Sequence, residues 1–446
     1  MRGQLTDAPA EFPTSPEPLM SLRRIRPRLG LGVVTALAVV GALAAAAPSA
    51  AAAPAASAAA SARHAGDTRF YVPPPPPGSV QQIKDLVRSG DLRDALGIAR
   101  MVTTPQAVWF TSGTPAEVRR SVRRTVNAAA RQHAVPVLVA YNLPFRDCAQ
   151  YSAGGATDTA AYLAWIRAFA AGIGNRPAVV ILEPDGLGII PNNTDINGNK
   201  EWCRPAGSGA TPEERYRALN GAVDALGRHH ATKTYLDGTH SAWLAVGDVS
   251  QRLVRAGVQR ATGFFLNVSN FQTTSRQLKY GTWISECIAY ATAVRGDAAR
   301  TARFKACGSQ YYPADPNDES TWYKTDQWYA ANLGTAVPKA HFVIDTSRNG
   351  QGPWAGPADY PAGLDPEVWC NPPDRGLGLR PTTRTGNRLA DAFLWIKTPG
   401  QSDGQCTRGT KGPTDPVRGI VDPPAGAWFP QMAIELVRNA NPPVVR

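Results

Sequence analysis

The chain has 446 residues, of which 43% are hydrophobic, 8% aromatic and 18% charged, and this composition excludes intrinsic disorder for most of it. Lys and Arg number 47 against 35 Asp and Glu, but the resulting charge of +12 is scattered and forms no block typical of a nucleic-acid-binding arm. The common zinc, P-loop, dinucleotide and nucleophile-elbow motifs do not occur, so we expect no cofactor, no metal and no nucleic-acid partner.

The N-terminal residues predict export. Four arginines between Arg23 and Arg28 precede an uncharged, mostly apolar run over 29–47, and Ala-x-Ala cleavage options follow at 50–53. We therefore expect a secreted, extracellular protein in which residues 1–53 are an N-terminal extension plus signal peptide, with Met20 as the alternative start. An uncleaved anchor is the other interpretation, because the run is barely long enough to span a bilayer. After cleavage we expect no stable membrane association.

The next segment predicts a linker followed by one folded domain. Residues 54–68 are rich in Ala and Ser, and a stiff polyproline stretch follows at 73–77. We expect the domain to cover residues 69–446. A monomer is the expected state for a secreted chain of this size.

Short apolar runs then alternate with longer helical segments, which predicts an α/β fold with a buried parallel sheet. Helices are expected over 115–133, with Thr114 as the N-cap, and over 159–173 and 212–228. The predicted strands span 107–110, 136–141, 178–182, 234–236, 263–266, 341–344 and 392–396. About seven such units predict a barrel-like closure or a wide doubly wound sheet.

Polar and aromatic side chains follow these predicted strands. In parallel α/β folds the ligand site forms at the carboxyl ends of the strands, so these side chains should converge on one rim. In chain order they are Arg146, Asp147, Glu183, Asp185, Asp237, His240, Trp243, Asn267, Asn270, Asp345, Arg348, Lys397 and Asp403.

Carboxylates without metal-ligand spacing, interleaved with Trp109, Trp243 and Trp369, are what cleavage of a neutral sugar chain needs. One carboxyl donates a proton to the leaving oxygen, another activates water or holds charge, and indole faces stack on pyranose rings. Their coincidence at the strand ends favours a glycan-active site.

Each of these residues also has a plain structural alternative. Asp185 after Pro184 is a possible N-cap of the next helix, and Asp147 is a possible loop residue held by a disulfide at Cys148. Single tryptophans more often pack than bind sugar, and a lone histidine such as His240 is usually structural.

Two segments are specific enough to indicate a family. They read VAYNLPFRDCAQYSAGG at 139–155 and VVILEPDGLG at 179–188, and they resemble the signature segments of glycoside hydrolase family 6, the cellobiohydrolases and endoglucanases that cut β-1,4-glucan. The resemblance covers nearly everything from Arg69 onward. It continues through YLDGTHSAW at 235–243, NVSN at 267–270, DTSRNG at 345–350, WC at 369–370 and WIKTPGQSDG at 395–404.

The resemblance implies a distorted, partly open parallel β/α barrel of about seven strands and hydrolysis with inversion of the anomeric carbon. By position Asp185 would be the proton donor, Asp147 would raise the pKa of Asp185 and steer water, Tyr141 would crowd the sugar at the cleavage point, and Asp403 would be the candidate base. Substrate-binding roles are implied for Trp109, His240, Trp243, Asn270, Trp369, Lys397, Gln401, Asp237 and Arg348. Gln401 stands where the family usually has Glu, so there we expect hydrogen bonding without charge.

Six cysteines in an exported chain predict three disulfides, and the residues alone allow fifteen pairings. The resemblance implies Cys148 with Cys203 and Cys370 with Cys406, which leaves Cys287 with Cys307.

The long stretch over 403–428 and the long interval between Asn270 and His341 resemble the loops that roof the cleft in exo-acting members. We therefore expect a cellobiohydrolase that releases cellobiose from non-reducing ends, with β-1,4-glucan chains as its partner. One alternative is an endo-β-1,4-glucanase of the same family. Another is a non-catalytic β-glucan-binding protein, which the presence of Asp147, Asp185 and Asp403 disfavours. A third is an enzyme of the same kind that acts on another β-glucan in the producer's own cell wall or sheath.

Overall fold

The computed structural model describes residues 67–312 and 318–445, so the predicted N-terminal extension, signal peptide and most of the predicted linker lie outside the described residues. Asp67, near the end of the predicted linker, already contacts the folded unit, because its carboxylate accepts hydrogen bonds from Thr382 and Thr383. None of the helices in these ranges combines the length and the apolarity that a membrane crossing requires.

Within the described ranges, seven parallel strands form one sheet in which each strand pairs with the next one along the chain. They are β1 (Val108–Phe110), β2 (Val137–Ala140), β3 (Ala178–Leu182), β4 (Thr232–Asp237), β5 (Gly263–Leu266), β6 (His341–Asp345) and β7 (Ala390–Leu394). The two edges of the sheet approach each other, since the N–H of Ala107 beside β1 donates to the carbonyl of Trp395 beside β7 over 2.9 Å. The predicted distorted, partly open β/α barrel is confirmed.

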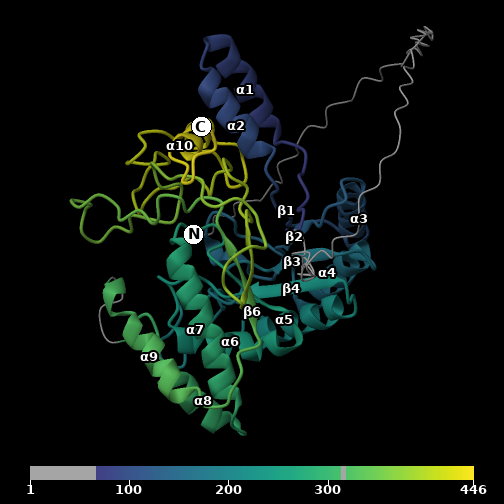
Figure 1. Cartoon of the computed structure of the whole chain (residues 1–446), viewed down its shortest axis with the longest axis vertical. Helices are drawn as coiled ribbons and strands as arrows, with labels where there is room; N and C mark the ends of the chain where they lie inside the picture. The colour runs from purple at the N-terminus through teal and green to yellow at the C-terminus, as the bar shows by residue number, and fades with distance from the viewer. Residues whose placement is uncertain (1–66, 313–317, 446) are drawn as a thin grey trace, which may run out of the picture. The chain divides into compact units, whose positions relative to one another are not determined.

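Helices surround this sheet (Figure 1). They are α1 (Pro77–Ser89), α2 (Leu92–Val102), α3 (Pro115–Arg131), α4 (Thr159–Ile173), α5 (Pro212–Gly227), α6 (Val246–Arg255), α7 (Thr274–Thr292), α8 (Asp297–Ala306), α9 (Tyr323–Asn332) and α10 (Pro430–Arg438). Helix α3 begins as predicted, because Thr114 accepts from the N–H of Glu117 and the Glu117 carboxylate accepts from the N–H of Thr114. This reciprocal capping box fixes the start of the helix.

Alternate residues of each strand face two different cores, as the two-residue period of a strand requires. Leu138 and Val180 pack toward the surrounding helices, whereas Val139 and Ile181 fill the barrel interior. Because both faces are buried, the strands read as uninterrupted apolar runs. A separate core joins α1, α2 and α10 around Trp395, and Figure 1 shows α1 and α2 beside α10.

The strands that differ most from prediction are β4 and β7, which both begin two residues earlier than expected. The added residues are partly polar and therefore do not continue an apolar run. Asp391 in β7 accepts a hydrogen bond from the Tyr235 hydroxyl over 2.5 Å and contacts Nδ1 of His341 over 2.8 Å. These polar contacts between strands extend the sheet by residues that an apolar run does not predict.

Candidate active site

The loops that follow the carboxyl ends of the strands enclose a cavity of about 450 Å³. The predicted residues that line it are Trp109, Tyr141, Asp147, Asp185, His240, Trp243, Asn270, Trp369, Lys397 and Asp403. Asp237, Arg348 and Gln401 lie outside this lining. Residues up to 294 positions apart in the sequence, Trp109 and Asp403, therefore share one site, as expected for a parallel barrel.

Asp185 is the lining carboxyl with the strongest tendency to keep its proton. Burial, followed by the negative charges of Asp237 and Asp147, raises the pKa of Asp185 well above its usual range. The next helix begins at Pro212 and has Thr211 as its N-cap, so Asp185 does not cap it. Asp185 instead lies in a turn directly after β3 with a left-handed φ of 61°.

Asp147 has a pKa between those of Asp185 and Asp403. Burial raises the pKa of Asp147 to about 6, although the N–H of Ser152 donates to its Oδ2 over 2.7 Å and Arg146 lies nearby. Its neighbour Cys148 is bonded to Cys203, which ties the loop after β2 to the loop after β3. Asp147 therefore has a fixed backbone and a pKa close to neutrality.

Asp403 is ionised under all ordinary conditions. Burial by itself would raise the pKa of Asp403, but ion pairs with Arg348 over 2.8 Å and Lys397 over 2.9 Å outweigh it and lower the pKa to about 2. Arg348 is fully buried, so it acts on the cavity through Asp403. Lys397 lies at the cavity wall.

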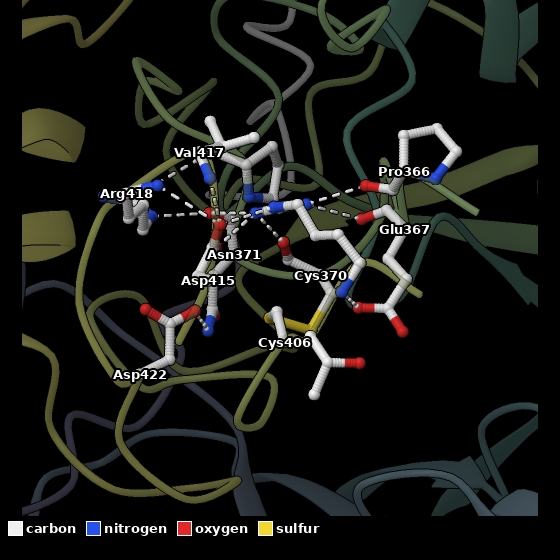
Figure 2. A network of polar contacts seen from close by, with 12 residues as sticks. Pro366, Glu367, Cys370, Asn371, Cys406, Asp415, Val417, Arg418 and Asp422 are labelled. Carbon is white, nitrogen blue, oxygen red and sulfur yellow. Dashed lines mark hydrogen bonds and ion pairs between the residues drawn. A yellow bond between two sulfur atoms is a disulfide. The ribbon is translucent and has the colours of Figure 1, made fainter. Parts of the chain in front are cut away.

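Asn371 holds the backbone on which Asp403 lies. The N–H of Asn371 donates to Oδ2 of Asp403, and Oδ1 of Asn371 accepts from the N–H of Asp403 over 2.8 Å. The Asn371 amide nitrogen in turn donates to Ser402 and to the carbonyl of Gly404, each over 2.9 Å. It also donates to Asp422 over 2.9 Å, and both residues are labelled in Figure 2. Both polar atoms of the Asn371 side chain are hydrogen-bonded, and Asn371 contacts both the backbone N–H and the carboxylate of Asp403. These contacts fix the position of Asp403.

The buried ion pair between Arg408 and Asp415 lies next to Asn371 and holds the backbone around it. Arg408 and Asp415 are both fully buried and contact each other through two hydrogen bonds of 2.8 Å. Arg408 also donates to the carbonyl groups of Pro366, Glu367 and Cys370. The surroundings of this pair, with the Cys370 disulfide, appear in Figure 2. The ion pair thus joins the segment before Asn371 to the segment after Asp403.

Cys406, Asp415 and Asp422 are a group of potential metal ligands whose donor atoms lie within 4.8 Å of one another. Cys406 is bonded to Cys370, and both carboxylate oxygens of Asp415 are bonded to Arg408. Of the three residues, Asp422 alone keeps a carboxylate oxygen without a hydrogen-bond partner, so the group does not offer three available ligands.

Glu183 and Asp237 brace the loops that carry the acids. Oε2 of Glu183 accepts from the N–H groups of Asn142 and Leu143, and Oδ2 of Asp237 accepts from those of residues 187–188. Asp237 therefore lies beneath the site. Glu183 is predicted among the polar side chains of the rim, but it lies outside the cavity lining and holds the backbone of Asn142 and Leu143 instead.

Aromatic side chains form much of the remaining wall. Trp109 donates from its indole nitrogen to the carbonyl of Ile396 over 2.8 Å and meets Tyr141 edge to face at 5.4 Å. Burial lowers the pKa of His240 to about 4, so its imidazole is neutral and can exchange hydrogen bonds with sugar hydroxyls. Gln401 pairs through its backbone with Trp428, beside the segment that carries Asp403.

Loop residues without a predicted role complete the lining. They are Gln150, Ser152, Ile189, Trp202, Ala242, Ser269, Phe271, Gln272, Pro353, Trp354, Asp365 and Val368. The two tryptophans carry a sequence signal, because they are large aromatics in loops rich in Gly, Pro and Asn. Loop paths are not periodic, so the sequence does not indicate that the other positions reach the cavity.

The structure contains three disulfides, and they join the pairs that the resemblance implies. Cys148 is bonded to Cys203, Cys287 to Cys307 and Cys370 to Cys406. Two of them hold loops of the site, whereas Cys287 and Cys307 join α7 to the end of α8.

Comparisons with known proteins agree on one family. The sequence model of Glycosyl hydrolases family 6 matches residues 65–440. Endoglucanase A of Thermobispora bispora is 34% identical over 383 residues, which cover 85% of this chain and 64% of that relative. "Probable 1,4-beta-D-glucan cellobiohydrolase C" of Aspergillus terreus is 30% identical over 328 residues, which cover 68% of this chain and 59% of that relative. The chain thus spans about three fifths of the length of these relatives.

A solved structure has the same fold. It is the endoglucanase Cel6 from Mycobacterium tuberculosis in complex with methyl-cellobiosyl-4-deoxy-4-thio-β-D-cellobioside, with a TM-score of 0.58 and 33% identity. The match covers 83% of this chain and 97% of that structure.

Proposed function

Because the chain belongs to Glycosyl hydrolases family 6, we propose that it hydrolyses the β-1,4-glucosidic bonds of cellulose and cello-oligosaccharides with inversion of the anomeric carbon. One observation carries the proposal: a carboxyl that keeps its proton, Asp185, shares a tryptophan-lined cavity with two carboxyls of lower pKa, Asp147 and Asp403. Glycoside hydrolysis needs this division between a proton donor and a carboxylate that assists water.

In the proposed reaction, the proton of Asp185 moves to the glycosidic oxygen as the bond between that oxygen and C1 breaks. The oxygen of a water molecule forms the new bond to C1 from the opposite face, and its proton passes to a carboxylate. We propose Asp147 as this carboxylate in place of Asp403, the base that the resemblance implies, because Asp147, with a pKa of about 6, is a better proton acceptor than Asp403, with a pKa of about 2. The permanent charge of Asp403 then stabilises the positive charge that develops on the sugar ring.

We further propose that the enzyme is exo-acting and releases cellobiose, because three loops meet at the cavity wall. The Tyr151 hydroxyl donates to the Glu367 carboxylate over 3.0 Å and accepts from the N–H of Thr407 over 2.9 Å. Gln150, Ser152, Val368 and Trp369, which flank these contacts, line the cavity. A wall closed by contacts between distant loops favours entry of a chain end over entry of an internal segment.

The long segment after Asp403 supports the same proposal. The two ends of this segment lie side by side, since the N–H of Ser402 donates to the carbonyl of Ala427 and the N–H of Gly426 donates to the carbonyl of Ser402. Residues 403–427 therefore form a closed loop with defined ends beside the cavity.

We expect the Tyr151 contacts to control the mode of attack. Tyr151→Ala removes two hydrogen bonds and the ring, and at about 1 kcal/mol per bond this shifts the balance toward an open wall roughly 30-fold. The variant should therefore lower the viscosity of soluble carboxymethylcellulose faster, per reducing end formed, than the wild type does. Tyr151→Phe, which keeps the ring, should lie between the two. Equal viscosity curves for all three would contradict the assignment.

The experiment that tests the function itself is proton NMR of the purified protein with cellohexaose, following product length and anomer in the first minutes. Fresh α-cellobiose as the main product is the expected result. A β-anomer would contradict inversion, and absence of any product would favour the glucan-binding alternative or another β-glucan.

An endo-β-1,4-glucanase is the second candidate function. It is favoured by the names of the bacterial relative at 34% identity and of the solved structure at 33% identity, which are both endoglucanases. In the same NMR experiment an endo-acting enzyme would give products of mixed length with the same anomer.

We also propose that the enzyme acts outside the cell as a monomer. Three disulfides form and persist in an oxidising compartment, which supports the export predicted from the N-terminal residues.

A further inference from the structure

Trp202 has an unusual combination of location and exposure. It lines the catalytic cavity, yet 54% of the residue is exposed, and it belongs to none of the hydrophobic clusters in the described part of the chain. A large aromatic side chain gains most from burial, so one held in water beside a site points to a ligand that covers it.

The backbone on both sides of Trp202 is fixed. Glu201 forms an ion pair of 2.6 Å with Arg252, whose side chain is only 3% exposed. Cys203 is bonded to Cys148, the neighbour of Asp147. Anchors on both sides fix the backbone that carries the indole, and a preorganised backbone reduces the entropy lost when a ligand binds.

Trp202 also borders a second cavity, of about 540 Å³, whose lining includes both cysteines of the Cys148–Cys203 disulfide. Phe145, Arg146, Thr157 and Arg204 contribute to its lining, which contains no acidic residue. Trp202 is the residue that the two linings share, and the second cavity, here called the groove, has hydrogen-bond donors but no carboxylate for catalysis.

We propose that Trp202 is a stacking platform for a glucose unit outside the catalytic cavity, and that the same glucan chain continues from it into the second cavity. The proposal rests on the proposed function, because the occupant is the β-1,4-glucan of the catalytic site. The flat apolar face of a glucose ring suits an indole, and the guanidinium of Arg204 can donate to its hydroxyl groups. The Thr157 hydroxyl, which donates to Asp158, can accept from them. The groove binds without hydrolysis and gives the enzyme a preference for longer chains.

The test compares kcat/KM on cellohexaose with kcat/KM on cellotriose for each variant. In Trp202→Ala the ratio should fall about fivefold, the typical size of an aromatic contact, whereas Trp202→Phe should keep most of it. Tyr323→Ala is the matched control, because Tyr323 is an aromatic residue of similar exposure, 52%, that lines neither cavity. Its ratio should equal that of the wild type.

A wild-type ratio in Trp202→Ala would overturn the platform while leaving the proposed function intact. If the wild type cleaves neither oligosaccharide, the proposed function fails instead, and calorimetric titration with cellohexaose then decides the platform. Affinity that falls about fivefold in Trp202→Ala, and not in Tyr323→Ala, supports it, whereas equal affinities refute it.

Discussion

Replacing Asp185 by Asn should lower kcat on cellotetraose about 1,000-fold, within the usual range for loss of a general acid. Burial and the charges of Asp237 and Asp147 keep the proton on Asp185, and an amide of the same shape has no acidic proton to donate. Because the shape is kept, affinity for cello-oligosaccharides should stay close to that of the wild type. Initial rates by reducing-sugar release and calorimetric titration measure the two quantities separately.

The pH profile gives this prediction a second readout. In the wild type, kcat/KM should fall as the pH drops through about 6, because Asp147 becomes protonated and can no longer accept a proton. It should also fall at alkaline pH, because Asp185, whose pKa is raised, then loses the proton that it donates. The residual activity of Asp185→Asn should lack the alkaline limb. Asp297→Asn, on the exposed surface of α8, is the control and should behave as the wild type. A variant at Asp185 that retains more than a tenth of the activity would rule out its role as the acid.

The strands and the acids of the site were predictable from sequence for one physical reason. A parallel strand buried on both faces is an apolar run, and the residue that ends the run lies at the rim. Tyr141 after β2 and Asp185 after β3 follow this rule, and both line the cavity. Where the start of a strand includes a polar residue that is paired with another strand, as Asp391 in β7 is, an apolar run misplaces the start of the strand.

Whether a side chain near the strand ends lines the cavity or is buried behind its wall was not predictable from the sequence. Arg348 and Asp237 follow strands just as Lys397 does, but the structure buries Arg348 against Asp403 and Asp237 against backbone N–H groups. Position after a strand therefore predicts proximity to the site, and only the packing around each residue separates wall from support.

The loops that shape the cavity were the least predictable part. Trp202 and Trp354 reach the lining from long connections whose paths depend on a disulfide and a buried ion pair with partners far away in the sequence. Glu183 is the exception, since a buried acid at the end of a strand is visible in the sequence once its cost is considered.

The buried ion pair of Arg408 and Asp415 should dominate the stability of the segment that carries Asp403. Asp415→Ala leaves the guanidinium of Arg408 buried and unpaired, which costs about 3–5 kcal/mol. We expect a fall in the thermal midpoint of roughly 5–10 °C together with faster proteolysis of the segment over 403–428. Activity should fall in parallel, because Asn371 and Asp403 lose their support.

The double variant Arg408→Met with Asp415→Leu separates a missing charge partner from a missing ion pair. Apolar side chains of similar volume remove both charges, and such replacements of buried pairs are often neutral or stabilising. The double variant should therefore recover most of the lost midpoint. The activity of the double variant tests what Arg408 does for catalysis. Arg408 also donates to the carbonyls of Pro366, Glu367 and Cys370, and Met cannot replace these hydrogen bonds. Stability regained with activity still low would mean that these contacts hold Asn371 and Asp403 in place, whereas a double variant no more stable than Asp415→Ala would refute the charge argument.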